Sequence, residues 1–221
     1  MSPEPAQVRL VENATDAEIA KATQTLCDAF GGRFFTDELD GDIKLVPYIL
    51  GAYLKAGLVG GQVYFAEDAT EGIVGVAIWF QPGHTSFGTP EQRAAGWDEL
   101  MGKLSERCRS WWTEFLKLLY DEFVEKQLGS GVMRAAYHLQ LIGIHPKYQK
   151  RGIGSKLLGI VGEQARVNNT TCVLETPSKQ LATEVYGSVG YRIRGHLEDI
   201  KDADGKPSFG FYVLQKDERA E

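Results

Sequence analysis

The sequence is short of features that mark whole classes of protein. It has three cysteines, Cys27, Cys108 and Cys172, an odd number whose spacing fits no metal site. We therefore expect reduced, mostly buried thiols and no bound metal. No apolar run approaches the ~20 residues that span a bilayer, and the first residues lack the basic and apolar regions of a signal peptide. These absences predict a cytoplasmic protein with no membrane partner.

An excess of basic residues is also missing. The 24 lysines and arginines are outnumbered by 30 aspartates and glutamates, which leaves a net charge of −6. Proteins that bind nucleic acid usually carry a basic patch, so we expect no nucleic-acid partner. Hydrophobic residues make up 43% and charged residues 24% of the 221 residues, which excludes a disordered chain. The length allows one large domain or two small ones.

Apolar periodicity predicts alternating elements along the chain. The expected order is β-α-α-β-β, then a helical stretch, then β-α-β-α-β-β. Strands alternate with helices only in the second half, so we expect an α/β protein of the mixed α+β kind, with a mixed sheet and helices on both faces. The expected strands are 8–11, 62–66, 73–80, 136–144, 171–176, 190–194 and 209–214; the expected helices are 15–30, 43–57, 153–166 and 177–188, with a loop over 33–42.

Residues 90–128 have a helical period and hold three of the four tryptophans. Ala94, Trp97 and Leu100 share one helical face, and Trp111, Phe115 and Leu118 lie on a longer one. An apolar stripe at this spacing is more often core than ligand contact, so packing is the favoured interpretation of the stripe.

A glycine-rich turn between a predicted strand and a predicted helix carries the clearest chemistry. Gly152 and Gly154 let the backbone approach a ligand, and the start of the following helix offers unpaired N–H groups to an anion. Lys147, Lys150 and Arg151 add positive charge beside it. A P-loop is absent, and the third glycine of a dinucleotide-binding turn is missing. The turn therefore predicts a pyrophosphate-bearing ligand; the alternative is that the glycines only permit tight packing.

The wider pattern resembles the GNAT family of N-acetyltransferases. Gln149-x-x-Gly152-x-Gly154 is similar to the acetyl-CoA motif of that family, and Tyr186 to Tyr191 is similar to its later Tyr-x-x-x-Gly-Tyr element. The likeness is closest to small-molecule members such as puromycin N-acetyltransferase, which also have a helical insertion. The resemblance implies the GNAT fold, with a mixed sheet of about six or seven strands, and one domain over 1–221 with a helical insertion at 83–131.

The resemblance also implies acetyl-CoA as cofactor and a pose for it. The diphosphate is expected on the N–H groups of 150–155, and the pantetheine along the strand at 142–144 like an added strand. Ser178 or Gln180 would replace an asparagine that the family often has before its tyrosine. The expected cofactor-binding residues are Ile142, Gly143, Ile144, Gln149, Lys150, Arg151, Gly152, Ile153, Gly154, Ser155 and Ser178.

Three residues are candidates for acid–base chemistry. An amine must lose a proton before it attacks a thioester, and a histidine suits that task near neutral pH. Period 2 places His138 on one strand face with Gln140, Ile142 and Ile144, toward the cofactor. Glu175 is the rival base. The alternatives are a half-buried structural histidine and a helix-capping glutamate. By resemblance, Tyr186 is the acid that protonates the departing thiolate, unless it is a core tyrosine.

The acceptor is expected to be the amine of a small molecule, in detoxification or resistance among other roles. By resemblance, the loop between the first two helices lines its site, which points to Phe34, Phe35 and the acidic run 37–42. Trp111 of the insertion is a further candidate, with the insertion as a wall or lid. Alternatives are acetylation of a protein N-terminus or lysine, and a non-catalytic acetyl-CoA-binding protein. Direct transfer is expected because nothing supports Cys172 as a nucleophile. For the oligomeric state, the expectation is a monomer or a homodimer.

Overall fold

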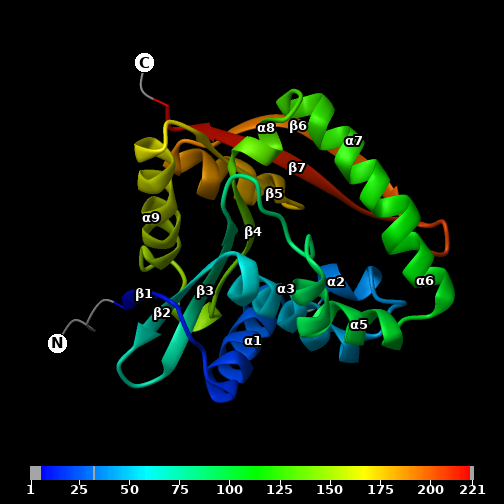
Figure 1. Cartoon of the computed structure of the whole chain (residues 1–221), viewed down its shortest axis with the longest axis horizontal. Coiled ribbons are helices and arrows are strands. Elements are labelled where there is room, and N and C mark those ends of the chain that lie inside the picture. Colours follow the sequence, from blue (N-terminus) through cyan, green and yellow to red (C-terminus); the bar gives the residue numbers. More distant parts are fainter. Residues whose placement is uncertain (1–5, 32, 220–221) are drawn as a thin grey trace.

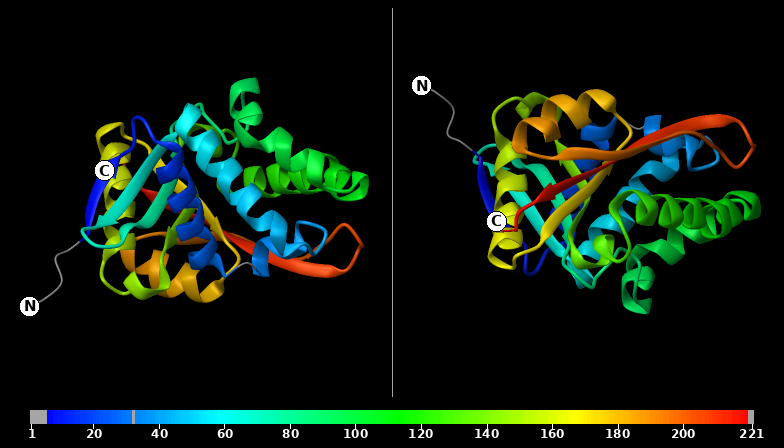
Figure 2. Two further views of the ribbon diagram at one scale, coloured as in Figure 1. Left: turned by 90° about the horizontal axis from the view of Figure 1, so that it is seen from below. Right: turned by 90° about the horizontal axis from the view of Figure 1, so that it is seen from above.

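The computed structural model describes residues 6–31 and 33–219, without the side chains of Arg33 and Phe34. Seven strands form one sheet in the order β1-β2-β3-β4-β5-β7-β6, with helices on both faces (Figures 1 and 2). This mixed α/β architecture confirms the predicted fold class. The strands are β1 (Gln7–Leu10), β2 (Gln62–Asp68), β3 (Gly72–Phe80), β4 (Tyr137–Ile144), β5 (Thr171–Thr176), β6 (Arg192–Lys201) and β7 (Pro207–Asp217).

The helices fall into two groups along the chain, before and after β4. Those before it are α1 (Asp16–Phe30), α2 (Arg33–Asp37), η1 (Ile43–Leu45), α3 (Val46–Gly60), α4 (Pro90–Gln92), η2 (Arg93–Trp97), α5 (Asp98–Lys103), α6 (Glu106–Ser110), η3 (Trp111–Leu116), α7 (Lys117–Leu128) and α8 (Val132–Ala135). Those after it are η4 (Pro146–Tyr148), α9 (Ile153–Val167), η5 (Leu181–Tyr186) and η6 (Gly187–Val189).

The sheet separates between β4 and β5. Every neighbouring pair of strands is antiparallel except this one, which is parallel and pairs only Tyr137–Leu139 with Cys172–Leu174. Beyond Leu139, β4 continues beside β3 alone, and β5 continues beside β7. The separation leaves one edge of β4 without a strand partner over its second half.

A β-bulge in β4 overturns the expected face of His138. Ile78 of β3 pairs with Leu141 and Trp79 with Leu139, so Gln140 has no partner across the ladder. An extra residue of this kind reverses the alternation of side chains. Tyr137 and Leu139 accordingly pack in the same cluster as Ile142 and Ile144, with α9. The prediction that His138 shares a face with Ile142 and Ile144 was therefore wrong.

The two faces of the sheet have separate cores. One face packs against α9 and η5, whose Leu157, Val161 and Ala182 meet β4 and β5. The other packs against α1 and α3 at one end and against α7 at the other, and Figure 1 shows α7 running alongside the β6–β7 hairpin. Val173 of β5 belongs to this second face, so His138 and Glu175 lie on the side of α3 and α7.

Several boundaries differ from the sequence expectations. The expected loop over 33–42 contains the short helix α2. The β6–β7 hairpin is much longer than expected, because β6 runs to Lys201 and β7 begins at Pro207. Bulges near Leu197 and Ile200 interrupt the period in β6, which explains why its alternation is hard to recognise in the sequence.

One stretch is longer and more apolar than the sequence analysis allowed. Residues 43–60 form 18 helical residues with a mean hydropathy of 1.3, enough by length and composition to cross a membrane. Over half of this stretch, 56%, is buried inside the fold. Buried core helices of soluble proteins have the same length and composition, and α3, which makes up most of this stretch, packs in the core.

Candidate active site

The turn between β4 and α9 is built for close approach to its backbone. Gly152 caps α9 with φ +79°, in the left-handed region that glycine adopts most easily. The N–H of Lys156 bonds the carbonyl of Gly152 at the start of the α9 ladder, so the N–H groups before Lys156 precede the helical hydrogen bonds. A Cβ at Gly154 would meet open space. These features fit a diphosphate at the helix N-terminus.

The basic side chains of this turn are exposed and partly organised. Lys147, Lys150 and Arg151 all lie at the surface. The Arg151 guanidinium donates to the Lys147 carbonyl (2.9 Å) and lies over the ring of Tyr148 at 4.7 Å. In an otherwise acidic chain this group provides a local positive charge beside α9.

The second half of β4 has an open edge. Its residues Ile142, Gly143 and Ile144 pair with β3 on one side and with no described strand on the other. An extended chain such as pantetheine can add to an edge of this kind. A Cβ at Gly143 would come within 3.0 Å of Leu26 and Ala29, so this glycine allows α1 to pack closely. The Gln149 side chain donates to the Ile144 carbonyl (3.1 Å) and ties the turn to the strand end.

Two expected cofactor residues have other environments. The Ser178 hydroxyl accepts from the N–H of Leu181 (3.2 Å), the first residue of η5. Ser155 is exposed on α9 and borders a small hollow with Tyr191 and Lys216. The structure therefore groups the remaining residues around the open edge and the turn, while Ser178 has a structural partner of its own.

His138 and Glu175 form one hydrogen-bonded pair. Nε2 of His138 lies 2.8 Å from Oε2 of Glu175, with side-chain exposures of 9% and 15%. They stand on β4 and β5 at the point where these strands separate. The neutral imidazole has one N–H, and donation from Nε2 to the carboxylate leaves the lone pair on Nδ1. The sequence analysis treated His138 and Glu175 as alternative bases. In the structure the two side chains are hydrogen-bonded to each other.

Two tyrosines that the sequence analysis missed interact electrostatically with Glu175 of this pair. Tyr53 of α3 and Tyr120 of α7 are half-buried. Burial and then the charges of Glu38 and Glu175 raise the pKa of Tyr53. Burial and then Glu175 also raise the pKa of Tyr120. Both phenols stay protonated near neutral pH and offer O–H donors close to Glu175, whose buried Oε1 has no hydrogen-bond partner in the described part of the chain.

Tyr186 lies apart from the His138–Glu175 pair. It is buried in the cluster on the α9 face and meets Tyr191 edge-on at 6.0 Å. Burial raises the pKa of Tyr186 to about 12, which keeps its hydroxyl protonated. Among the described residues no hydrogen bond joins Tyr186 to His138 or Glu175, and the sheet stands between the two faces. Its expected role as an acid stays a prediction.

The adjacent tryptophans of η3 tie two distant elements together. Nε1 of Trp111 donates to the Lys201 carbonyl of β6 (2.8 Å), and Nε1 of Trp112 donates to the Glu38 carbonyl after α2 (2.8 Å). Their rings meet edge-on at 5.5 Å. The segment 83–131 thus connects the β6–β7 hairpin to the acidic run 37–42. Trp111 is 7% exposed, so it makes its part of this connection as a buried core residue.

The acidic run 37–42 is docked against the helices of this segment. Asp40 accepts from the N–H and the hydroxyl of Ser105, both at 3.0 Å, and pairs with Arg107. Arg107 also bonds Asp204 at the hairpin tip. Phe35 is buried in the core and meets Phe30 edge-on at 5.3 Å, while the side chain of Phe34 lies outside the described part. The structure thus places Phe35 in the core beside the expected acceptor loop.

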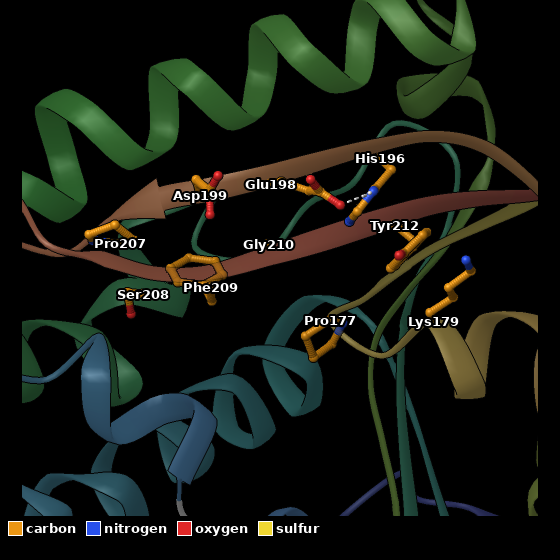
Figure 3. A pocket seen from close by; sticks show the side chains of 10 residues that line it. All are labelled: Pro177, Lys179, His196, Glu198, Asp199, Pro207, Ser208, Phe209, Gly210 and Tyr212. Carbon is orange, nitrogen blue, oxygen red and sulfur yellow. Dashed lines mark ion pairs between the residues drawn. The ribbon is translucent and has the colours of Figure 1, made fainter.

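A hollow of about 380 Å³ lies along the β6–β7 hairpin (Figure 3). His196 stacks on Tyr212 with the ring centroids 3.8 Å apart, and its Nδ1 is 3.2 Å from Glu198. Thr176 of β5 pairs with Tyr212, one residue beyond Glu175, so the hollow opens on the opposite face of β5 from the His138–Glu175 pair. Pro177 and Lys179, which follow β5, also line it. The hollow is a feature that the sequence analysis missed.

Thiol and metal chemistry find no support in the described residues. Burial raises the pKa of Cys172 to about 12 and that of Cys108 to about 11, so neither thiol ionises near neutral pH. No group of three or more histidine, cysteine, aspartate or glutamate side chains is arranged to hold a metal ion in the described ranges. The His138–Glu175 pair is therefore the best candidate for moving a proton.

Comparison with known families identifies this arrangement. Residues 91–200, from α4 through β6, match the model of the GNAT acetyltransferase domain. The chain carries a GNAT acetyltransferase domain. It is an acyltransferase of the N-acetyltransferase type, and GNAT acetyltransferases use acetyl-CoA as the acetyl donor. No curated protein matches the chain.

Solved structures share the GNAT fold over nearly the whole chain. A protein from Corynebacterium glutamicum described as histone acetyltransferase HPA2 and related acetyltransferase is 20% identical, with a TM-score of 0.62 and coverage of 99% of this chain and 98% of its own. A putative arylalkylamine N-acetyltransferase 7 from Aedes aegypti is 15% identical, with a TM-score of 0.60 and coverage of 99% and 96%. At these identities the likeness shows the fold alone, and the expected likeness to puromycin N-acetyltransferase stays a prediction.

Proposed function

We propose that this GNAT protein transfers the acetyl group of acetyl-CoA directly to an amine of a small molecule. The observation that carries the proposal is the His138–Glu175 pair, held at 2.8 Å where β4 and β5 separate. A histidine oriented by a carboxylate is a common arrangement for a general base. The proposal concerns substrate class and residue roles; the GNAT assignment itself does not depend on it.

The residues around β4 and α9 fit acetyl-CoA. The N–H groups at the start of α9, with Gly152 as its cap, would hold the diphosphate. The open edge at Ile142–Ile144 would hold the pantetheine. Bound there, acetyl-CoA supplies a thioester whose carbonyl carbon the amine attacks. In this proposal the thioester meets the amine beside His138, where the pairing of β4 with β5 ends.

The roles of the chain's own groups follow from their hydrogen bonds. Glu175 accepts from Nε2 of His138, which leaves Nδ1 free to take a proton from the acceptor ammonium. The carboxylate then stabilises the imidazolium that forms. Tyr186, kept protonated by its burial, is the proposed donor to the departing thiolate.

The segment 83–131 favours a small acceptor over a protein. It packs over the face that carries His138 and links the hairpin to the acidic run through Trp111 and Trp112. A peptide acceptor needs an open groove. Hydrogen bonds that hold the segment against the hairpin and the acidic run favour an enclosed site instead. A ribosomal-protein-alanine N-acetyltransferase from Escherichia coli shares the fold at 11% identity and a TM-score of 0.51, over 97% of this chain and 96% of its own. Acetylation of a protein N-terminus or lysine is therefore the second candidate.

The test is turnover with defined acceptors, followed by release of free thiol from acetyl-CoA. We expect small primary amines to support turnover and peptides with free N-termini or lysines to support little. Replacing His138 with alanine should lower kcat by about a hundredfold or more, while acetyl-CoA still binds. His84→Ala is the matched control, because His84 is an exposed histidine whose Nδ1 lies 3.2 Å from the Pro82 carbonyl. Preference for peptides, or full activity in His138→Ala, would overturn the proposal.

A further inference from the structure

The hollow along the β6–β7 hairpin exists because one strand position has no side chain. Side chains of a strand alternate between its faces, so Ser208, Gly210 and Tyr212 of β7 share one face, and all three line the hollow. A Cβ at Gly210 would lie 2.4 Å from the Leu197 carbonyl of β6, so the close approach of the two strands keeps this gap open. The space of about 380 Å³ is large enough for a small organic ligand.

The bulge in β6 brings two consecutive acids to this hollow. In a regular strand, Glu198 and Asp199 would point to opposite faces. Both line the hollow, because the ladder with β7 is interrupted between Leu197 and Ile200 and Asp199 adopts a φ of +56°. A bulge re-aims side chains in this way. Two carboxylates therefore border the same space.

Three polar groups of this lining lack a partner within the described part of the chain. The buried Oγ of Ser208 has none, and no hydrogen bond or ion pair holds the carboxylate of Asp199 or the amine of Lys179. Glu198 is paired, because its Oε1 lies 3.2 Å from Nδ1 of His196. The hollow thus offers an unpaired negative charge on β6, an unpaired positive charge after β5 and a hydroxyl on β7.

A stacked pair of rings lies between the two unpaired charges. The ring centroids of His196 and Tyr212 are 3.8 Å apart, and the ring planes differ by 7°. His196 precedes Asp199 on β6. Tyr212 pairs with Thr176, the last residue of β5 before the turn that carries Lys179. Figure 3 shows Asp199 and Lys179 on either side of the stack, so the rings can contact the apolar middle of a ligand.

We infer that this hollow is a binding site for an organic zwitterion, with the ammonium group of the ligand on Asp199 and its carboxylate on Lys179. The hydroxyl of Ser208 lies at the Asp199 end of the hairpin, where Ile200 pairs with Phe209, and would accept a hydrogen bond from the same ammonium. A ligand with a single charge would leave Asp199 or Lys179 unmatched. An unbranched ω-amino acid is the simplest member of this class.

Isothermal titration tests the site with three ligands that share one carbon chain and differ in their charged ends: ε-aminocaproate, hexylamine and caproate. Titrations of the full chain are made with and without saturating CoA, which fills the groove proposed for the cofactor and transfers no acetyl group. In both, ε-aminocaproate should bind at least about tenfold more tightly than either analogue. Equal affinity for an analogue, no binding of ε-aminocaproate, or loss of its binding with CoA would each overturn the inference.

Two variants locate the ligand. Asp199→Asn keeps a residue that tolerates the left-handed backbone, and Lys179→Met replaces an exposed side chain, so both should fold. Each should weaken the binding of ε-aminocaproate by about tenfold. Asp98→Asn and Lys126→Met are the matched controls, because both residues are exposed on α5 and α7. Wild-type affinity in Asp199→Asn or Lys179→Met, or equal losses in the controls, would place the ligand elsewhere and overturn the inference.

Discussion

The β4–α9 turn and the acidic loop around Glu38 are specified by stretches of chain of very different length. The turn is local: Gln149, Gly152 and Gly154 shape it within six residues, and the helix dipole and N–H groups follow directly. The loop depends on Cys108 and Trp112, more than 60 residues away in the sequence. The turn, which is proposed to hold acetyl-CoA, is specified by a local motif, while the loop, which is proposed to border the acceptor, is assembled by tertiary contacts.

The largest expected effect concerns the β4–α9 turn. Gly154→Glu places a carboxylate where a Cβ now meets open space, at the positive end of α9. We expect acetyl-CoA affinity to fall by about a hundredfold or more, because the new charge repels the diphosphate and fills its site. Isothermal titration with acetyl-CoA measures this effect. Gly102→Glu is the control, since it also adds a glutamate at an open helical glycine; unchanged affinity in Gly154→Glu would break the assignment.

A smaller effect is expected for the buried acid of the acceptor half. Burial raises the pKa of Glu38 from 4.5 to about 8, so between these values the folded chain holds a proton that the unfolded chain has lost. The free energy of unfolding must therefore fall as the pH rises through this window, and the fall ends above about pH 8. Glu38→Gln should remove this dependence, worth about 3–4 kcal/mol between about pH 5 and about pH 8.

Urea denaturation at the two pH values measures this difference, with Glu106→Gln as the exposed control. A wild-type curve and a Glu38→Gln curve that change equally with pH would show that Glu38 does not titrate as its burial implies. The same result would weaken the distinction between the local turn and the buried loop.

The smallest effects concern the two indole donors of η3. Trp111→Phe and Trp112→Phe each keep a ring and remove one N–H, which leaves the carbonyl of Lys201 or Glu38 without that donor. Each change should lower the free energy of unfolding by about 1 kcal/mol. Acetyl-CoA affinity should stay constant while the KM of the acceptor rises a few-fold. An effect on acetyl-CoA rather than on the acceptor would contradict the division of the molecule into two halves.

Much of the fold was predictable because its signals are local. Period and turn residues located the strands before and after α9, and the motif located Gly152. The bulge at Gln140 was not predictable, because it is defined by pairing with β3 and reverses the face of His138. His138 and Glu175 were each recognisable by residue type, but their pairing depends on the separation of β4 from β5. Nothing near Glu38 in the sequence indicates burial, which comes from the segment 83–131.

The measurement that tests the account most directly is a double-mutant cycle on kcat with His138→Ala, Glu175→Gln and both together. In the proposed mechanism the two hydrogen-bonded side chains act as one unit, in which Glu175 acts through His138. It predicts that Glu175→Gln lowers kcat in the wild-type background and has almost no effect once His138 is alanine. Effects that multiply, so that the double variant loses the product of the two single losses, would contradict the central claim and show that the residues act independently.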